Sequence, residues 1–179
     1  MAYYFFDFSD AGKQTLIGFL RSIAKQLCTQ VDPLHLPEPL KALYVTCKGE
    51  NPSASQLTHL LSTLNNGSSA DFIVVDALDE CLEQGSNRER EAFFDMLSQL
   101  KGATVGTYNI FISSRPEPDI RSAMSLLANS MLDVQGPGIY GDIHSHIVAY
   151  LSNDTRMRKW PPGVKDEVIK DLSEKANGM

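Results

Sequence analysis

FIVVDALDEC, from Phe72 to Cys81, is the stretch of sequence that decides the fold. The residues before Asp76 are all apolar, which is typical of a strand buried on both faces of a parallel sheet. Such a strand places Asp76 at its carboxyl end, where α/β proteins bind ligands. Asp79 and Glu80 follow in the loop. In phosphoryl transfer, one acid at a strand end holds Mg²⁺ and a second acts on the attacking water. A solvated acidic loop explains the same residues equally well.

A second apolar run, IFISSRPEP from Ile110 to Pro118, predicts another buried strand, which ends in the polar residues 113–115. An arginine at such a strand end, Arg115, can contact a terminal phosphate and report its presence. The alternative is a surface arginine that pairs with Glu117 or Asp119. Two polar strand ends in this order favour a ligand site more strongly than either one does alone.

Hydrophobic periodicity outlines the elements around these two strands. Short apolar runs predict strands at residues 3–8, 71–78 and 109–115, and a further short strand at 131–134. Spacings of three and four predict helices, the first with Leu16, Leu20, Ile23 and Leu27 on one face. Strands that alternate with helices indicate an α/β fold with a parallel sheet. We expect residues 1–136 to form this core and residues 137–179 to begin a small helical subdomain.

Composition limits the classes of function. The 179 residues suffice for one domain with a core, and the net charge of -6 argues against non-specific nucleic-acid binding, which needs a surplus of Lys and Arg. Cys28, Cys47 and Cys81 fit neither the spacing of a zinc site nor a disulfide framework. No apolar run is long enough to cross a membrane, and the amino terminus MAYYFFDF lacks the basic region of a signal peptide. We expect a cytoplasmic protein.

The motifs together resemble those of one protein family. DALDEC followed by FISSRPEPDI looks like the Walker B and sensor 1 pair of NACHT-type (STAND) P-loop NTPases, and more narrowly of the nephrocystin-type NACHT modules of fungal signalling proteins. YYFFDFSDAGKQTLIGFLRSIAKQL resembles the second strand and following helix of that module. DIHSHIVAYL and LSEKANGM resemble its helical tail. The resemblance therefore covers nearly the whole chain.

This resemblance implies a signal-transducing NTPase that switches between nucleotide-bound states, with ATP or GTP and Mg²⁺ as its ligands. By position in the motifs, Asp76 would serve Mg²⁺, and Asp79 and Glu80 would act around the attacking water. Arg115 would be the sensor, with Ser114 beside it at the nucleotide. Protein partners would act through flanking domains.

The sequence departs from the family pattern at the phosphate loop. No G-x-x-x-x-G-K-[S/T] occurs in it. GKQT, from Gly12 to Thr15, lacks the upstream glycine and separates the lysine from the threonine, so we expect it to start a helix instead. We expect the chain to be the middle of a longer module, inactive as a hydrolase by itself.

A missing phosphate-loop strand has a structural consequence. In the family's sheet that strand lies beside the sensor 1 strand, so its absence leaves an open edge with unpaired backbone groups. We expect either the strand near Leu132 or another chain to pair there. A different class of function stays open too: a nucleotide-independent interaction fragment that docks on a full-length NTPase through this edge or through an exposed helix face.

Overall fold

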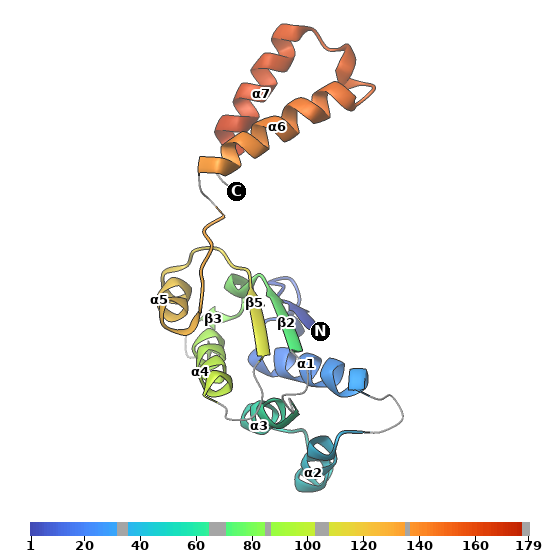
Figure 1. The fold of residues 1–179 in the computed structure, drawn as a ribbon, viewed down its shortest axis with the longest axis vertical. Coiled ribbons are helices and arrows are strands. Elements are labelled where there is room, and N and C mark those ends of the chain that lie inside the picture. Colours follow the sequence, from blue (N-terminus) through green and yellow to red (C-terminus); the bar gives the residue numbers. More distant parts are fainter. Residues whose placement is uncertain (32–35, 65–70, 85–86, 103–107, 135–136, 177–179) are drawn as a thin grey trace. The chain divides into compact units, whose positions relative to one another are not determined.

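The computed structural model describes residues 1–31, 36–64, 71–84, 87–102, 108–134 and 137–176. Internal contacts divide the chain into two compact units, Met1–Asn129 and Ser130–Met179. The first unit holds a sheet with its helices, and the second is a helical hairpin (Figure 1). No helix in the described part of the chain is long and apolar enough to span a membrane.

The sheet of the first unit has three parallel strands. They are β1 (Ala2–Phe5), β2 (Asp71–Asp76) and β5 (Tyr108–Ile112), in the spatial order β1-β2-β5. The predicted α/β class with a parallel sheet is therefore confirmed. The first strand is shorter than predicted, because a turn closed by the hydrogen bond from the Asp10 N–H to the Asp7 carbonyl bends the chain soon after Phe5.

Helices fill the connections between these strands. The described elements of the first unit are η1 (Ala11–Lys13), α1 (Leu16–Val31), α2 (Glu38–Cys47), α3 (Ala54–Leu64), η2 (Leu78–Glu80), the hairpin β3 (Glu83–Gln84) with β4 (Asn87–Arg88), α4 (Glu89–Lys101) and α5 (Pro118–Leu127). Local capping explains where some of them begin. At α3 the Ser53 hydroxyl accepts from the Gln56 N–H, and the Gln56 amide oxygen accepts from the Ser53 N–H, which is a capping box.

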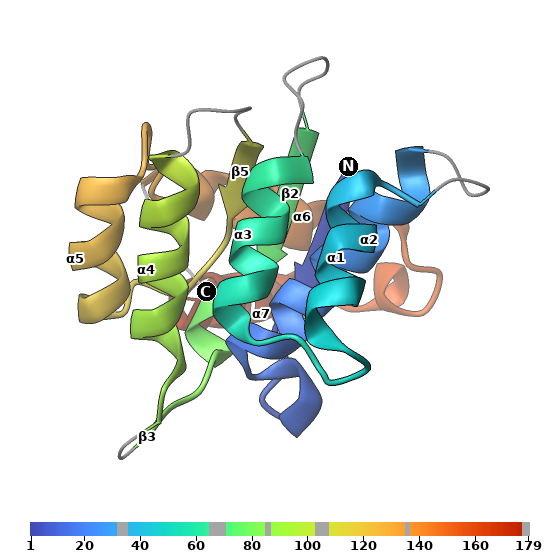
Figure 2. The ribbon, with the colours of Figure 1, turned by 90° about the horizontal axis from the view of Figure 1, so that it is seen from below.

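The core lies on one face of the sheet, under α1, α3 and α4, which lie side by side in Figure 2. From the sheet, Tyr4 and Val75 are among the buried residues, and Phe19 of α1 meets Phe93 of α4 with ring centroids 5.1 Å apart. Fully burying a side chain of this size contributes roughly 1.5–3 kcal/mol. Tyr4 of β1 also meets Phe19, with ring centroids 5.5 Å apart, so aromatic contacts tie the first strand, α1 and α4 into one core.

The opposite face of the sheet is exposed. Its apolar side chains are Tyr3 (53% exposed), Phe5 (52%), Phe72 (51%), Phe111 (68%) and the half-buried Val74. The expectation that the DFIVVDAL strand is buried on both faces is therefore wrong. The chain visits β1, β2 and β5 in one direction across the sheet, and right-handed crossovers in one direction place every connecting helix on the same face.

The edge of the sheet at β5 is also open. Among the described residues β5 pairs with β2 only. The strand predicted at 131–134 is absent, and Leu132 is exposed in an irregular segment after α5. The expectation that this segment pairs with β5 is wrong, because residues 131–134 form no strand. Pairing by another chain stays a hypothesis.

The second unit is a helical hairpin of α6 (Pro137–Asn153) and α7 (Pro162–Ala176), joined through η3 (Met157–Lys159). The Asp154 carboxylate accepts hydrogen bonds from the backbone N–H groups of Arg156 and Met157 and so fixes the turn. Leu151 is buried, whereas the aromatic side chains of Tyr140 and Tyr150 are about half exposed.

Candidate functional site

The predicted site residues gather at the carboxyl ends of β2 and β5. Asp76 is the last residue of β2, and η2 carries Asp79 and Glu80. Between them Ala77 adopts a left-handed conformation with a φ of 54°, which costs an L-residue about 1–2 kcal/mol. Two hydrogen bonds hold this turn, because Ser113 accepts from the Leu78 N–H on its carbonyl and from the Ala77 N–H on its hydroxyl.

Asp76 lies on the open face of the sheet, beside Ser113. In the parallel register Asp76 pairs with Phe5, whose side chain is exposed on that face. The Ser113 hydroxyl donates a hydrogen bond to the Asp76 carboxylate. A carboxylate offers about four acceptor positions, so Asp76 keeps capacity for a further ligand. Sequence reasoning did not assign a role to Ser113, although its place at the end of the apolar run IFIS is a signal for one.

Asp79 organises the loop after β5. Its carboxylate accepts hydrogen bonds from the Arg115 backbone N–H at 2.9 Å and from the Ser114 hydroxyl at 3.3 Å. The Arg115 Nε lies 3.6 Å from the second carboxylate oxygen, while 81% of the Arg115 side chain is exposed. The alternative partners of Arg115 were Glu117 and Asp119, and the structure pairs Arg115 with Asp79 instead.

Glu80 organises the loop after β1. Its carboxylate accepts a hydrogen bond from the Phe8 backbone N–H at 2.9 Å. The two acids of η2 therefore tie together the loops that follow the other two strands. The Asp76 carboxylate lies on the open face of the sheet, whereas the carboxylates of Asp79 and Glu80 already accept hydrogen bonds from backbone N–H groups.

A comparison with protein-family models assigns the chain to a family. A model described as Nephrocystin 3, N-terminal, matches residues 1–115, which is more than half of the 179 residues. The chain belongs to the nephrocystin 3 N-terminal family. The family match contains all three strands of the parallel sheet and every predicted site residue, and it ends at Arg115. No curated protein and no solved structure matches the chain.

The nephrocystin 3 N-terminal segment offers oxygen donors rather than a closed metal cage. Among its described residues, as in the rest of the described chain, no group of three or more His, Cys, Asp and Glu is placed to hold a metal ion. Mg²⁺ in nucleotide sites is bound through one or two carboxylates, with waters and substrate phosphates as the other ligands. The Asp76 carboxylate and the Ser113 hydroxyl fit that donor chemistry only together with a phosphate ligand.

The GKQT segment of the nephrocystin 3 N-terminal fold begins a helix. Gly12 and Lys13 lie in η1, and the Thr15 hydroxyl accepts from the Gly18 N–H at 3.2 Å at the start of α1. The Glu89 carboxylate accepts from the Leu16 N–H at 2.7 Å. A carboxylate therefore already occupies the amino end of α1 where a phosphate would bind. These contacts agree with the expected helix start.

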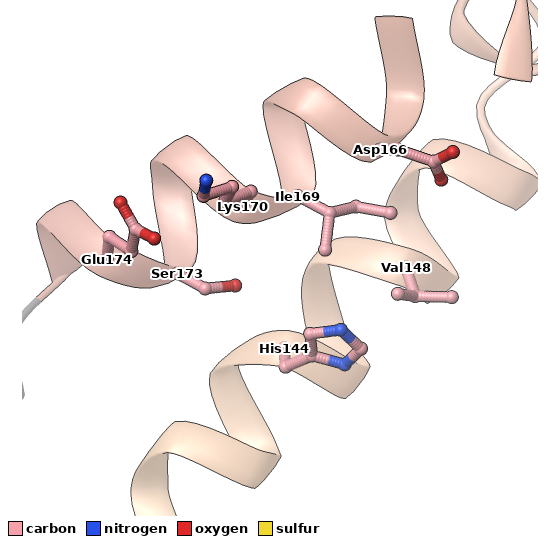
Figure 3. Close-up of a pocket in the computed structure, with 7 residues that line it drawn as sticks. All are labelled: His144, Val148, Asp166, Ile169, Lys170, Ser173 and Glu174. Atoms are coloured by element: carbon pink, nitrogen blue, oxygen red, sulfur yellow. The ribbon is translucent and has the colours of Figure 1, made fainter. Parts of the chain in front are cut away.

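The second unit has a groove of about 530 Å³ between α6 and α7, outside the nephrocystin 3 N-terminal match. Figure 3 shows Ile169 pointing toward Val148, while the charged ends of Asp166 and Glu174 lie far apart along α7. His144 lines the groove from α6. Because its polar groups do not converge on one point, this groove is a weaker candidate site than the strand ends.

Proposed function

We propose that the chain supplies the metal-facing and sensor half of a NACHT-type P-loop NTPase, a switch that binds ATP or GTP with Mg²⁺ in signal transduction. The observation that carries the proposal is the Asp76–Ser113 pair at the carboxyl ends of adjacent parallel strands. Ligands of open α/β sheets bind at that edge. Asp76 and Ser113 also face the uncovered side of the sheet, where a ligand has access.

The proposed roles follow the contacts. Asp76 and Ser113 would supply oxygen ligands to Mg²⁺. The bound Mg²⁺ would neutralise the charge of the phosphate groups. Asp79 holds the Arg115 backbone, so that the exposed guanidinium projects from the loop toward a terminal phosphate. Glu80 keeps the loop after β1 close to the same edge and offers its remaining acceptor positions to the attacking water.

By itself the chain is not expected to hydrolyse a nucleotide. Most phosphate-binding energy in P-loop proteins comes from consecutive backbone N–H groups and a lysine, and the sequence contains no such motif. Nucleotide binding by this chain is therefore expected to be weak, in the millimolar range, and hydrolysis is expected to be undetectable.

A paramagnetic experiment suits weak binding. Mn²⁺ replaces Mg²⁺ in complexes with ATP or GTP and broadens the NMR signals of nearby nuclei. In titrations of the full chain, the amide signals of Asp76, Ser113 and Arg115 are expected to broaden first. The broadening is expected to require both metal and nucleotide, because Asp76 alone cannot complete the coordination shell.

A matched pair of variants makes the test specific. Asp76→Asn removes the proposed ligand, whereas Asp95→Asn makes the same charge change on an exposed position of α4. Localised broadening lost in Asp76→Asn and kept in Asp95→Asn would support the proposal. Broadening that is absent, or equal in both variants, would refute the nucleotide site.

A second candidate function is a nucleotide-independent interaction fragment that docks on a protein partner, such as a full-length NTPase. The open edge of β5 and the exposed aromatic side chains of the sheet favour it, because both are features that a partner chain can cover.

A further inference from the structure

The outer edge of β1 is occupied by side chains of α1. The Gln26 amide oxygen accepts a hydrogen bond from the Tyr3 N–H at 3.1 Å, and the Gln26 amide nitrogen donates to the Tyr3 carbonyl at 2.8 Å. Gln30, four residues on, makes the same two contacts with the nitrogen and the carbonyl of Met1, at 2.9 and 2.6 Å. Two such bonds to one residue are what an antiparallel strand exchanges at a hydrogen-bonded pair. We call Gln26 and Gln30 the glutamine clamp.

The spacing of the glutamine clamp matches the spacing of the strand. Residues four apart on an α-helix are separated by about 6 Å along its axis, and residues two apart on a strand by about 6.6 Å. Gln26 meets Tyr3 and Gln30 meets Met1, so α1 runs antiparallel to β1 with nearly the same repeat. The Ser22 hydroxyl, one helical turn earlier, accepts from the Gln26 amide nitrogen at 3.2 Å and so helps to orient that amide. The helix therefore presents its amides in register with the backbone of the edge strand.

The glutamine clamp contributes little to stability but changes what another chain can reach. Gln30 is exposed and Gln26 is half-buried, so water offers both amides the same hydrogen bonds, and a held glutamine side chain loses rotamer freedom. The unpaired N–H and C=O groups of an edge strand are a template for pairing with another chain. At β1 the amides occupy these groups, whereas β5, the opposite edge, has no strand on its outer side among the described residues.

We propose that the glutamine clamp takes the place of an edge strand and prevents a second copy of this chain from pairing with β1. A second copy is the expected occupant of a bare β1, because two identical edges that meet antiparallel satisfy each other's backbone groups. The clamp requires no nucleotide, so its failure in a test leaves the proposed nucleotide site untouched. Closing β1 leaves β5 as the edge at which the sheet can be extended.

Three variants of the full chain separate the effect of the clamp from the loss of any glutamine. Gln26→Ala with Gln30→Ala removes both amides, uncovers the edge and keeps a good helix former at each position. Gln26→Lys with Gln30→Lys also removes both amides but places charges at the edge, which deter strand pairing. Gln99→Ala is the control, because Gln99 is an exposed glutamine of another helix, α4.

Hydrogen exchange of the Tyr3 amide measures the clamp directly, because Gln26 accepts from this N–H. At low protein concentration the amide is expected to exchange at least about tenfold faster in both double variants than in the unaltered chain, and at the unaltered rate in Gln99→Ala. At high concentration the exchange is expected to slow again in the alanine double variant only, since pairing with a second copy protects the amide. An exchange rate that is unchanged in both double variants, or association that protects amides of β5 instead, would overturn the proposal.

Sedimentation velocity over the same concentrations measures the association. The alanine double variant is expected to form a dimer or a larger species, while the lysine double variant and Gln99→Ala sediment like the unaltered chain. An alanine double variant that sediments like the unaltered chain would overturn the proposal, and so would equal association of the alanine and lysine double variants.

Thermal unfolding shows whether the amides act on the edge or on the fold. The midpoints of both double variants are expected to stay within a few degrees of the unaltered chain, because the hydrogen bonds of the clamp are accessible to water. A drop of about 10 °C or more would mean that the fold itself requires these amides, and it would overturn the proposal.

Discussion

Among the acids of the candidate site, Asp79 makes the largest set of side-chain contacts. It is the more buried partner of Arg115, with 10% of its side chain exposed, and it accepts hydrogen bonds from both Ser114 and the Arg115 backbone. Asp79 therefore fixes the position of the loop after β5. Any contact between this loop and a ligand depends on that position.

We predict that Asp79→Ala lowers the free energy of unfolding by about 1–3 kcal/mol, because hydrogen bonds to a charged group contribute about that much. Urea denaturation measures the change, with Asp95→Ala as the control at an exposed position. A loss no larger than that of the control would contradict the role of Asp79 as the anchor of this loop.

Asp7 provides a prediction on pH. Its pKa is lowered by the Ser9 hydroxyl and the Ser9 N–H, which both donate to its carboxylate, and by the charge of Lys13. A lowered folded-state pKa stabilises the fold above the ordinary carboxyl pKa, and that contribution is lost as the pH falls through the lowered value.

In Ser9→Ala the hydroxyl donor is gone, so the pKa of Asp7 is expected to rise toward its ordinary value. An NMR titration of the Asp7 side chain between pH 2 and 6 measures it. Lys13→Ala is the comparison, and it is expected to raise the pKa by less. An unchanged titration in Ser9→Ala would show that the hydroxyl is not the main cause.

At the scale of elements, the contact between η1 and α1 depends on a glycine. A Cβ on Gly18 would lie 2.5 Å from the Gly12 carbonyl oxygen and 3.0 Å from the Tyr4 hydroxyl. The first is a backbone atom, which cannot rotate away. The close approach of the two elements therefore requires glycine at position 18.

Gly18→Ala is expected to destabilise the fold by about 1–3 kcal/mol through this overlap, although alanine is the better helix former. Gly141→Ala in α6 is the matched control, because apart from its chain neighbours and the backbone of its own helix no atom lies within 4 Å of the position of its Cβ. There we expect a gain of up to about 1 kcal/mol from helix propensity. Thermal unfolding of both variants measures the change in stability. Equal changes in Gly18→Ala and Gly141→Ala would contradict the steric explanation.

For the whole molecule, the division into two units has a testable consequence. The second unit begins with the residues Ser130–Asp133, which are exposed and form no helix or strand. Exposed, irregular backbone is where proteases cut first. Chymotrypsin at low concentration is expected to cleave next to Leu132 and leave a fragment that holds all three strands of the parallel sheet. Mass spectrometry identifies the cut, and first cleavage within α1 or α4 would contradict the division.

The sequence by itself located the three strands of the parallel sheet and the strand end that carries Asp76, although it also predicted a strand at 131–134 that is absent. Apolar runs located β2 and β5, and spacings of three and four located α1. The carboxyl ends of parallel strands share one edge, which is why two polar strand ends in this order favoured a ligand site. These inferences succeed because local periodicity and strand direction are properties of the chain itself.

Only the tertiary structure decided which face of the sheet is covered and what the acids hold. The pairing of Glu80 with the Phe8 N–H spans 72 residues, and that of Asp79 with the Arg115 N–H spans 36. Ser113, rather than Ser114, meets Asp76 because side chains alternate along β5 and the register with β2 fixes which of them faces the same side. Register and crossover handedness act between distant segments, and no local pattern encodes them.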